Sequence, residues 1–130
     1  MNDFTYDEVL DLWIAPRKFL NYDIEVRLYC GKGDNLQQLA TRAINDIGNS
    51  WGLIKTAIIE ELLPLYLDHA TEELDGEAFF AKLPMKTIDL DAVDIMYTLF
   101  FGDGGLFGGH GIQVLWDPGE EFSADVSLVG

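Results

Sequence analysis

The chain has 130 residues, and its 23 Asp and Glu against 8 Lys and Arg give a formal net charge of −15. With 48% hydrophobic and 12% aromatic residues, it is too apolar for a disordered acidic tail, and its length suits a single domain over residues 1–130. So strong a negative charge argues against direct binding to nucleic acid or to an anionic membrane, because both would repel the protein.

Secretion, membrane insertion and disulfide bonding are not indicated. The N-terminal segment MNDFTYDEVLDLW lacks the basic and apolar regions of a signal peptide, and no apolar run approaches the ~20 residues of a membrane span. The single cysteine, Cys30, permits neither an internal disulfide nor a cysteine-based zinc site. The sequence therefore predicts a cytoplasmic domain with no cofactor.

The first predicted element is a strand over residues 24–29, where apolar and polar side chains alternate. A period of two is typical of a strand with one buried face, and the glycine-containing segment 31–33 ends it. Cys30 is expected to be a small core residue at this strand, because no local motif supplies the base that a cysteine nucleophile needs.

A helix is predicted next, because apolar residues recur with a 3.6-residue period over residues 36–47. Either Asp34 or Asn35 opens it, and Asp34 with Gln37 has the spacing of a capping box. Gly48 is expected to end the helix.

Two further helices follow in the sequence. The second helix begins near residues 49–50, and its broad apolar face predicts a buried central position. Pro64 lacks a backbone N–H, so we expect this helix to kink or end there. Asp75 is expected to cap a short third helix that contains residues 78–83.

From residue 86 onward the pattern changes to strands, which are predicted at residues 88–91, 95–101, 112–116 and, less regularly, 122–129. Asp-Gly-Gly and Asp-Pro-Gly sequences mark the turns between them. Because a run of strands follows a run of helices, we expect an α+β fold. The expected architecture is an antiparallel sheet of four to six strands with two main helices packed on one face.

The glycine-rich segment 101–114, FGDGGLFGGHGIQV, is distinctive but lacks the patterns of phosphate-binding loops. No Lys or Arg occurs after Lys86, and a strand follows the glycines where such a loop would lead into a helix. We interpret the segment as an irregular strand connection that needs positive φ angles or close backbone approach.

The two histidines, His69 and His110, have no metal-ligating spacing. Asp103 could orient the imidazole of His110, and this pair defines the alternative hypothesis of a small hydrolase or ligand-binding domain. Two other interpretations of His110 remain. It can form a hydrogen bond with the backbone of the turn, or it can contact a partner.

Several short sequences together resemble an uncharacterised bacterial domain family. They are Tyr-Asp-Glu at 6–8, Asn-Ser-Trp at 49–51, Phe-Phe at 79–80, Leu-Phe-Gly-Gly-His at 106–110, and the final Gly130. The family has the same order of parts, with a Leu-Phe-x-Gly-His turn before a closing strand pair, and it usually carries an aromatic residue where this chain has Gly108. Small acidic families of this kind resemble immunity proteins encoded beside secreted toxins, and the resemblance implies no catalytic residues.

Charge is unevenly distributed along the chain. Residues 1–86 carry all 8 basic and 15 acidic residues, a net −7, whereas residues 87–130 carry no basic and 8 acidic residues, a net −8. A surface of one sign steers a partner of the opposite sign. We therefore predict a non-enzymatic protein, an immunity protein that neutralises a basic toxin domain such as a nuclease. The simpler alternative is a charge that serves solubility alone.

The residues predicted to contact this basic partner are acidic side chains of the C-terminal strands, with three ring-bearing side chains as anchors. They are Asp89, Asp91, Asp103, Asp117, Glu120 and Glu121, with Phe107, His110 and Trp116. A homodimer formed through a sheet edge is compatible with either hypothesis.

Overall fold

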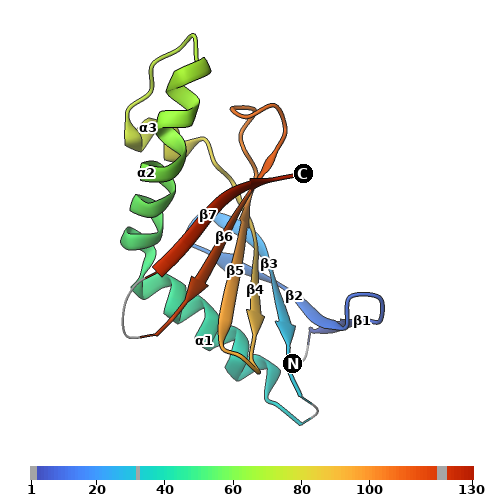
Figure 1. Cartoon of the computed structure of the whole chain (residues 1–130). Coiled ribbons are helices and arrows are strands. Elements are labelled where there is room, and N and C mark those ends of the chain that lie inside the picture. Colours follow the sequence, from blue (N-terminus) through green and yellow to red (C-terminus); the bar gives the residue numbers. More distant parts are fainter. Residues whose placement is uncertain (1–2, 32, 120–122) are drawn as a thin grey trace.

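The computed structural model describes residues 3–31, 33–119 and 123–130, which form one mixed sheet with helices on one of its faces (Figure 1). The strands are β1 (Thr5–Asp7), β2 (Leu12–Phe19), β3 (Tyr22–Tyr29), β4 (Met85–Asp91), β5 (Met96–Phe101), β6 (Gly111–Asp117) and β7 (Ser123–Val129). The helices α1 (Leu36–Asn49), α2 (Trp51–His69) and α3 (Gly76–Ala81) all lie between β3 and β4 in the sequence.

The strands lie side by side in the order in which they occur in the chain. Each neighbouring pair is antiparallel except β3 and β4, which run parallel because the helices return the chain to the end of the sheet where β3 begins. The predicted α+β class is confirmed. The prediction of an antiparallel sheet with four to six strands is wrong, because the sheet has seven strands and one parallel pair.

The strand β2 was not predicted, and its sequence explains why. Residues 12–15 are all apolar, so they show no alternation, and Pro16 cannot donate a hydrogen bond within a sheet. In the structure, the pairing of β1 with β2 ends where Thr5 lies opposite Ile14. Pro16 therefore lies beyond this pairing, at an edge of the sheet where its missing N–H costs little.

The hydrophobic core lies between the helices and the inner face of the sheet. Alternate residues of β3 to β6 are buried there, namely Ile24, Val26, Leu28, Ile88, Leu90, Tyr97, Leu99, Phe101, Ile112, Val114 and Trp116. The helices α1 and α2 contribute Ala40, Ala43, Ile47, Ile54, Ile58 and Leu62. Both main helices thus pack on one face, as predicted, and we call the opposite face the open face.

The helices begin largely where local sequence signals predict. Asn35 caps α1, since its side chain accepts a hydrogen bond of 3.0 Å from the backbone N–H of Gln38. Asp75 caps α3 in the same way through Ala78. Ser50 alone separates α1 from α2. No helix in the described part of the chain is both long and apolar enough to cross a membrane.

The prediction for the end of α2 is only partly correct, because the helix continues past Pro64 to its last residue, His69. Tertiary contacts stabilise this last stretch. The ring of Tyr66 packs against Phe79 at 5.8 Å, and its hydroxyl donates a hydrogen bond of 2.9 Å to the carbonyl oxygen of Glu72. These contacts offset the backbone hydrogen bond that proline removes.

Candidate interaction surface

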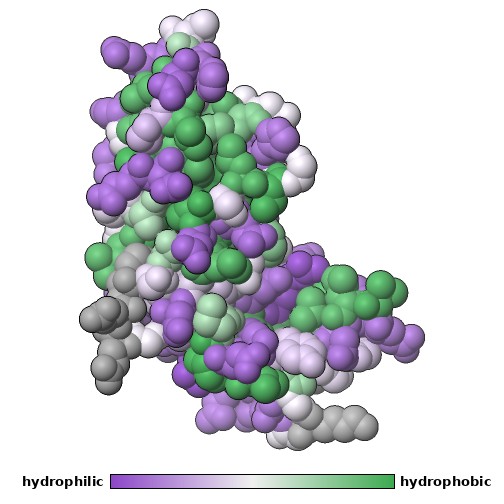
Figure 2. Space-filling model, in the orientation of Figure 1, coloured by the Kyte–Doolittle hydropathy of each residue, from purple (hydrophilic) through white to green (hydrophobic). Residues whose placement is uncertain are grey.

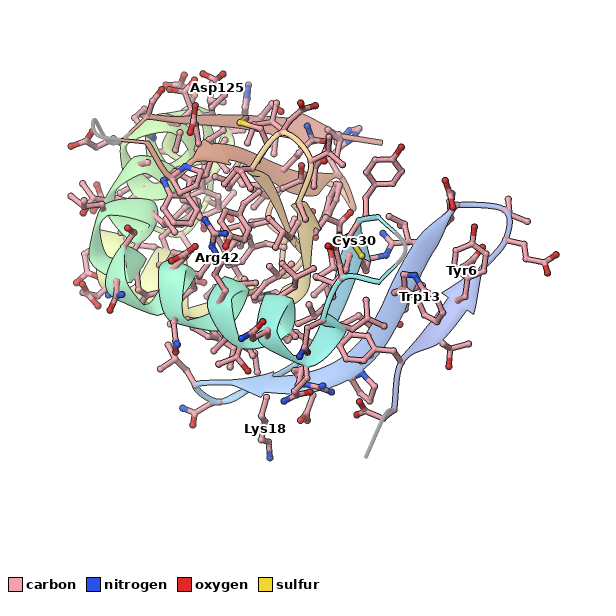
Figure 3. All side chains as sticks on the ribbon, turned by 90° about the horizontal axis from the view of Figure 1, so that it is seen from below. Tyr6, Trp13, Lys18, Cys30, Arg42 and Asp125 are labelled. Atoms are coloured by element: carbon pink, nitrogen blue, oxygen red, sulfur yellow. The ribbon has the colours of Figure 1, made fainter. Side chains whose placement is uncertain are left out.

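Four chain connections lie along the same end of the sheet, from the β1–β2 hairpin on the right of Figure 1 to the β6–β7 connection on the left. They join β1 to β2, β3 to α1, β4 to β5, and β6 to β7, and the parallel pairing of β3 with β4 puts them at the same end. We call it the acidic end. The carboxylates that the structure describes there are Asp7, Glu8, Asp11, Asp34, Asp91, Asp94 and Asp117. Figure 3 views the molecule from this side.

The described residues of these four connections include no Lys or Arg. The predicted contact residues Glu120 and Glu121 lie in the β6–β7 connection, and Lys32 lies between β3 and α1; all three are outside the described residues. All charged residues that the structure describes in these connections are therefore negative. Exposed apolar residues, Val9 and Leu10, accompany them at the β1–β2 hairpin, where Figure 2 shows a hydrophobic area.

Several of these carboxylates also stabilise the turns in which they lie. One oxygen of Asp7 accepts hydrogen bonds of 3.0 Å from the backbone N–H groups of Val9 and Leu10. Asp91 accepts in the same way from the backbone of the β4–β5 turn, and Asp117 from that of the β6–β7 turn. Each uses only one carboxylate oxygen in these bonds, so the second oxygen accepts no hydrogen bond from the described residues.

Asp89 lies on the open face of the sheet, two residues before Asp91 on β4 and facing the same side. Its Oδ2 is 3.6 Å from Nη1 of Arg27, the residue opposite it on β3. Burial raises the pKa of Asp89 to about 6, and the attraction of Arg27 only partly opposes this rise. Arg27 Nε, Thr87 Oγ1 and Asp89 Oδ1 are buried without a hydrogen-bond partner among the described residues.

The remaining predicted contact residues do not join the acidic end. Asp103, Phe107 and His110 belong to the β5–β6 connection, which lies at the opposite end of the sheet. Trp116 faces the helices, is only 3% exposed and stacks on Tyr97 with ring centroids 5.1 Å apart. The nine predicted residues therefore do not form one continuous surface.

Asp103 organises the β5–β6 connection from within. It is 8% exposed, and its carboxylate accepts hydrogen bonds from the backbone N–H groups of Gly105, Phe107 and Gly109 at 2.9, 3.0 and 2.7 Å. These bonds lower the pKa of Asp103. Gly104 has a φ of +60°, and a Cβ at this position would lie 2.1 Å from the carbonyl oxygen of Lys82. This supports the interpretation of an irregular connection that requires glycine.

His110 is exposed and has a partner other than Asp103. Its Nδ1 lies 2.6 Å from the carbonyl oxygen of Gly130, so the imidazole links the β5–β6 connection to the end of β7. In the described part of the chain, no hydrogen bond joins Asp103 to His110. The backbone interpretation of His110 fits this geometry, although the bond is to the end of the chain and not to the turn itself.

Two cavities lined by described residues bear on these predictions. The larger, of about 470 Å³, lies at the acidic end and is lined by Tyr6, Asp11, Trp13, Cys30, Gly31, Gly33, Asp34 and Leu36. The smaller, of about 330 Å³, lies beside the glycine-rich segment and is lined by Leu65, Tyr66, His69, Ala70, Leu106, Phe107, Gly108 and Leu128. Neither Asp103 nor His110 lines either cavity, so the alternative hypothesis gains no support from them.

Cys30 lines the larger cavity and is partly buried, so it packs against the core, as expected, but lies at its margin. Burial and the nearby carboxylate of Asp34 raise the pKa of its thiol, which keeps it protonated and unreactive at neutral pH. Among the described residues, no three His, Cys, Asp or Glu side chains are grouped to hold a metal ion.

The chain matches no protein-family model, and it is not significantly similar to any curated protein or solved structure. The resemblance to a bacterial domain family therefore rests on short motifs alone. The acidic end was missed as a unit by sequence reasoning, because its members come from connections that are far apart in the chain and meet only through the sheet topology.

Proposed function

We propose that this protein is a non-enzymatic binding protein that holds a basic protein partner at its acidic end. The observation that carries the proposal is that seven described carboxylates lie in four connections or at the strand ends beside them, all at one end of the sheet. The described residues of these connections include no Lys or Arg. Like charges gathered at one place destabilise a fold unless a counter-charge is supplied, and they attract a partner of opposite sign.

The ion pairs that the structure describes do not neutralise this surface. The described ion pairs of Arg17, Lys18, Arg27, Arg42 and Lys55 join acidic residues elsewhere in the molecule. Among the described residues, no ion pair supplies a counter-charge at the acidic end, and Lys32 of the β3–α1 connection lies outside them. A basic partner would supply such a counter-charge.

The strong acidity and the motif resemblance support an immunity-type role. In this role the partner is a basic toxin domain such as a nuclease, and the acidic end covers the surface with which that domain would bind phosphates. Complexes of this kind associate quickly at low salt and weaken as salt screens the charges.

The hydrolase hypothesis gains no comparable support. Asp103 uses its carboxylate to hold the backbone of its own connection, and His110 binds the carbonyl of Gly130. Among the described residues, no hydrogen bond joins the two side chains, so nothing shows Asp103 orienting the imidazole.

The proposal can be tested by retention of native partners on the tagged protein across a salt series, with identification by mass spectrometry. The test variant combines Asp91→Asn, Asp94→Asn and Asp117→Asn; asparagine removes the charge and can still accept the turn hydrogen bonds of the first and third. The control combines Glu60→Gln, Glu61→Gln and Asp68→Asn, which remove the same charge from exposed positions of α2.

We expect one basic protein to be retained at ~0.15 M salt by the wild type and the control, and to be lost from the test variant. Equal retention by the test variant and the control would contradict the proposed surface. Retention of no basic protein would contradict the proposed function.

A further inference from the structure

The larger cavity forms because the β1–β2 hairpin projects beyond the start of α1. Tyr6 and Trp13 are directly paired across the hairpin, on the same face of the sheet as the core residue Leu28. Figure 3 shows these two rings on the hairpin, with Cys30 on the neighbouring part of the chain. Leu36, the first residue of α1, contributes to the wall. The volume of about 470 Å³ suits a long side chain together with part of its backbone.

Two aromatic rings supply part of the chemistry of this cavity. The ring centroids of Tyr6 and Trp13 are 5.1 Å apart, and their planes are inclined by 55°. Tilted rings present both a face and an edge, and the faces of tyrosine and tryptophan attract cations. Such a pair accepts a cationic group better than an anionic one.

Two carboxylates supply the rest. Asp34 accepts a hydrogen bond of 2.8 Å from the N–H of Gly31 through Oδ2, and Asp11 accepts one from the hydroxyl of Tyr6 through Oδ1. Within the described part of the chain, each carboxylate thus retains its second oxygen for a ligand. These bonds also hold both side chains in place before binding, which lowers the entropic cost of binding.

The described lining of the cavity is negative. It contains two carboxylates and no basic side chain, and Lys32, between the lining residues Gly31 and Gly33, lies outside the described residues. The N-terminus of α1 contributes the opposite sign, but a helix dipole amounts to only about half an elementary charge there. The two carboxylates therefore outweigh the helix dipole in the described lining, and aromatic faces combined with carboxylate oxygens favour a cation.

We propose, resting on the proposed function above, that this cavity binds an arginine side chain of the basic partner between Tyr6, Trp13, Asp11 and Asp34. A guanidinium group stacks on aromatic rings and donates parallel hydrogen bonds to a carboxylate, whereas an ammonium group is compact and strongly hydrated. The cavity would anchor the partner while the rest of the acidic end steers it into place.

The test uses the tripeptide acetyl-Gly-Arg-Gly-amide and the full protein, observed by the NMR signal of the Trp13 indole N–H. The signal is assigned with Trp13→Phe. The first comparison peptide carries citrulline, which has nearly the shape of arginine without its charge, and the second carries lysine. Free arginine amide distinguishes a small-molecule ligand from a side chain of a protein.

We expect the arginine peptide to shift the Trp13 signal saturably, with at least about tenfold weaker binding of the citrulline peptide and weaker binding of the lysine peptide. Asp11→Asn and Asp34→Asn should each weaken binding by about fivefold or more. Asp94→Asn is the matched control, because it removes one charge from the same end outside the cavity, and it should change binding by less than about twofold.

Equal binding of the arginine and citrulline peptides, or an equal effect of Asp94→Asn and Asp34→Asn, would overturn the proposal. Binding of arginine amide more tightly than the peptide would also overturn it, since the ligand would then be a small molecule. If the basic partner is released by the triple variant at Asp91, Asp94 and Asp117 but not by Asp11→Asn or Asp34→Asn, the proposed function stands and the arginine site fails. Peptide binding without any retained basic protein would contradict the proposed function instead.

Discussion

The hydroxyl of Tyr97 donates a hydrogen bond of 2.6 Å to the carboxylate of Asp46, which joins the middle of the sheet to α1. Tyr97 is completely buried, and its ring stacks on Trp116. Burial and the carboxylate of Asp46 both raise the pKa of the phenol, so it remains a donor throughout the working pH range. Arg42 Nε lies 3.6 Å from the same carboxylate oxygen and adds a favourable charge.

Replacing Tyr97 by Phe removes the donor while retaining the stacked ring. We expect Tyr97→Phe to lower the free energy of unfolding by about 1–3 kcal/mol, because the hydrogen bond is made to a charged acceptor. Tyr29→Phe is the control, since its exposed hydroxyl makes no hydrogen bond with the described residues. Urea denaturation measures both changes, and a Tyr97→Phe variant as stable as the control would contradict a structural role for this bond.

The second prediction concerns Asp103 and the β5–β6 connection. Asp103→Ala removes the acceptor of three backbone N–H groups, and we expect it to cost about 2–4 kcal/mol of stability at neutral pH. The control is Asp125→Ala, which removes an exposed carboxylate of β7. Because the pKa of Asp103 is lowered by folding, its contribution is present at neutral pH and is lost as the pH falls through that lowered pKa. Equal stability of the two variants at pH 7 would show that the connection does not need this carboxylate.

Local signals made much of the helical part predictable. The helix period at 36–47, the capping residue Asn35 and the capping residue Asp75 each act within a few residues, and the structure places α1 and α3 accordingly. The extension of α2 beyond Pro64 was not predictable, because the packing of Tyr66 on Phe79 is a tertiary contact.

The acidic end and its cavity depend on long-range pairing. Asp11 and Asp34 lie at the same end because β2 pairs antiparallel with β3, and Asp91 joins them because β3 pairs parallel with β4. Nothing in the local sequence specifies the parallel pairing. For Asp103 and Trp116 the local element was predictable and the burial was not. The sequence places Asp103 in a turn and Trp116 on a strand, but it does not reveal that both side chains are buried.

The third prediction concerns Leu20 in the β2–β3 turn. Leu20 has a φ of +52° and is 62% exposed, so it adopts a left-handed conformation with little burial to offset the strain. Phe19 pairs with Tyr22 across this two-residue turn, a position where glycine is strongly preferred.

We expect Leu20→Gly to raise the free energy of unfolding by about 0.5–1 kcal/mol, after allowing for the extra freedom of glycine in the unfolded chain. Val93→Gly is the matched control, because Val93 is an exposed apolar turn residue without a positive φ. Val93→Gly should lower the free energy of unfolding slightly, because glycine has more conformational freedom in the unfolded chain. Thermal or urea unfolding measures both variants, and destabilisation by Leu20→Gly would show that the left-handed conformation of Leu20 is not strained.

The fourth prediction concerns Asp89, whose pKa of about 6 lies above that of an ordinary aspartate because the side chain is buried on the open face. The folded protein therefore binds this proton more tightly than the unfolded chain does. The contribution of Asp89 to stability is fully present below about pH 4 and is lost as the pH rises through about 6.

We compare the wild type with Asp89→Asn. The side chain of this variant cannot ionise, so its stability does not fall through ionisation at position 89 as the pH rises. Between pH 4 and pH 7, the stability of the wild type should fall by about 1–3 kcal/mol relative to the variant, since a shift of about two pKa units corresponds to that range. Asp125→Asn should leave the pH dependence of the wild type unchanged, because Asp125 is exposed. If the difference between the wild type and Asp89→Asn is the same at both pH values, the ion pair with Arg27 fully offsets the burial of Asp89, and the open face tolerates its charge without a partner.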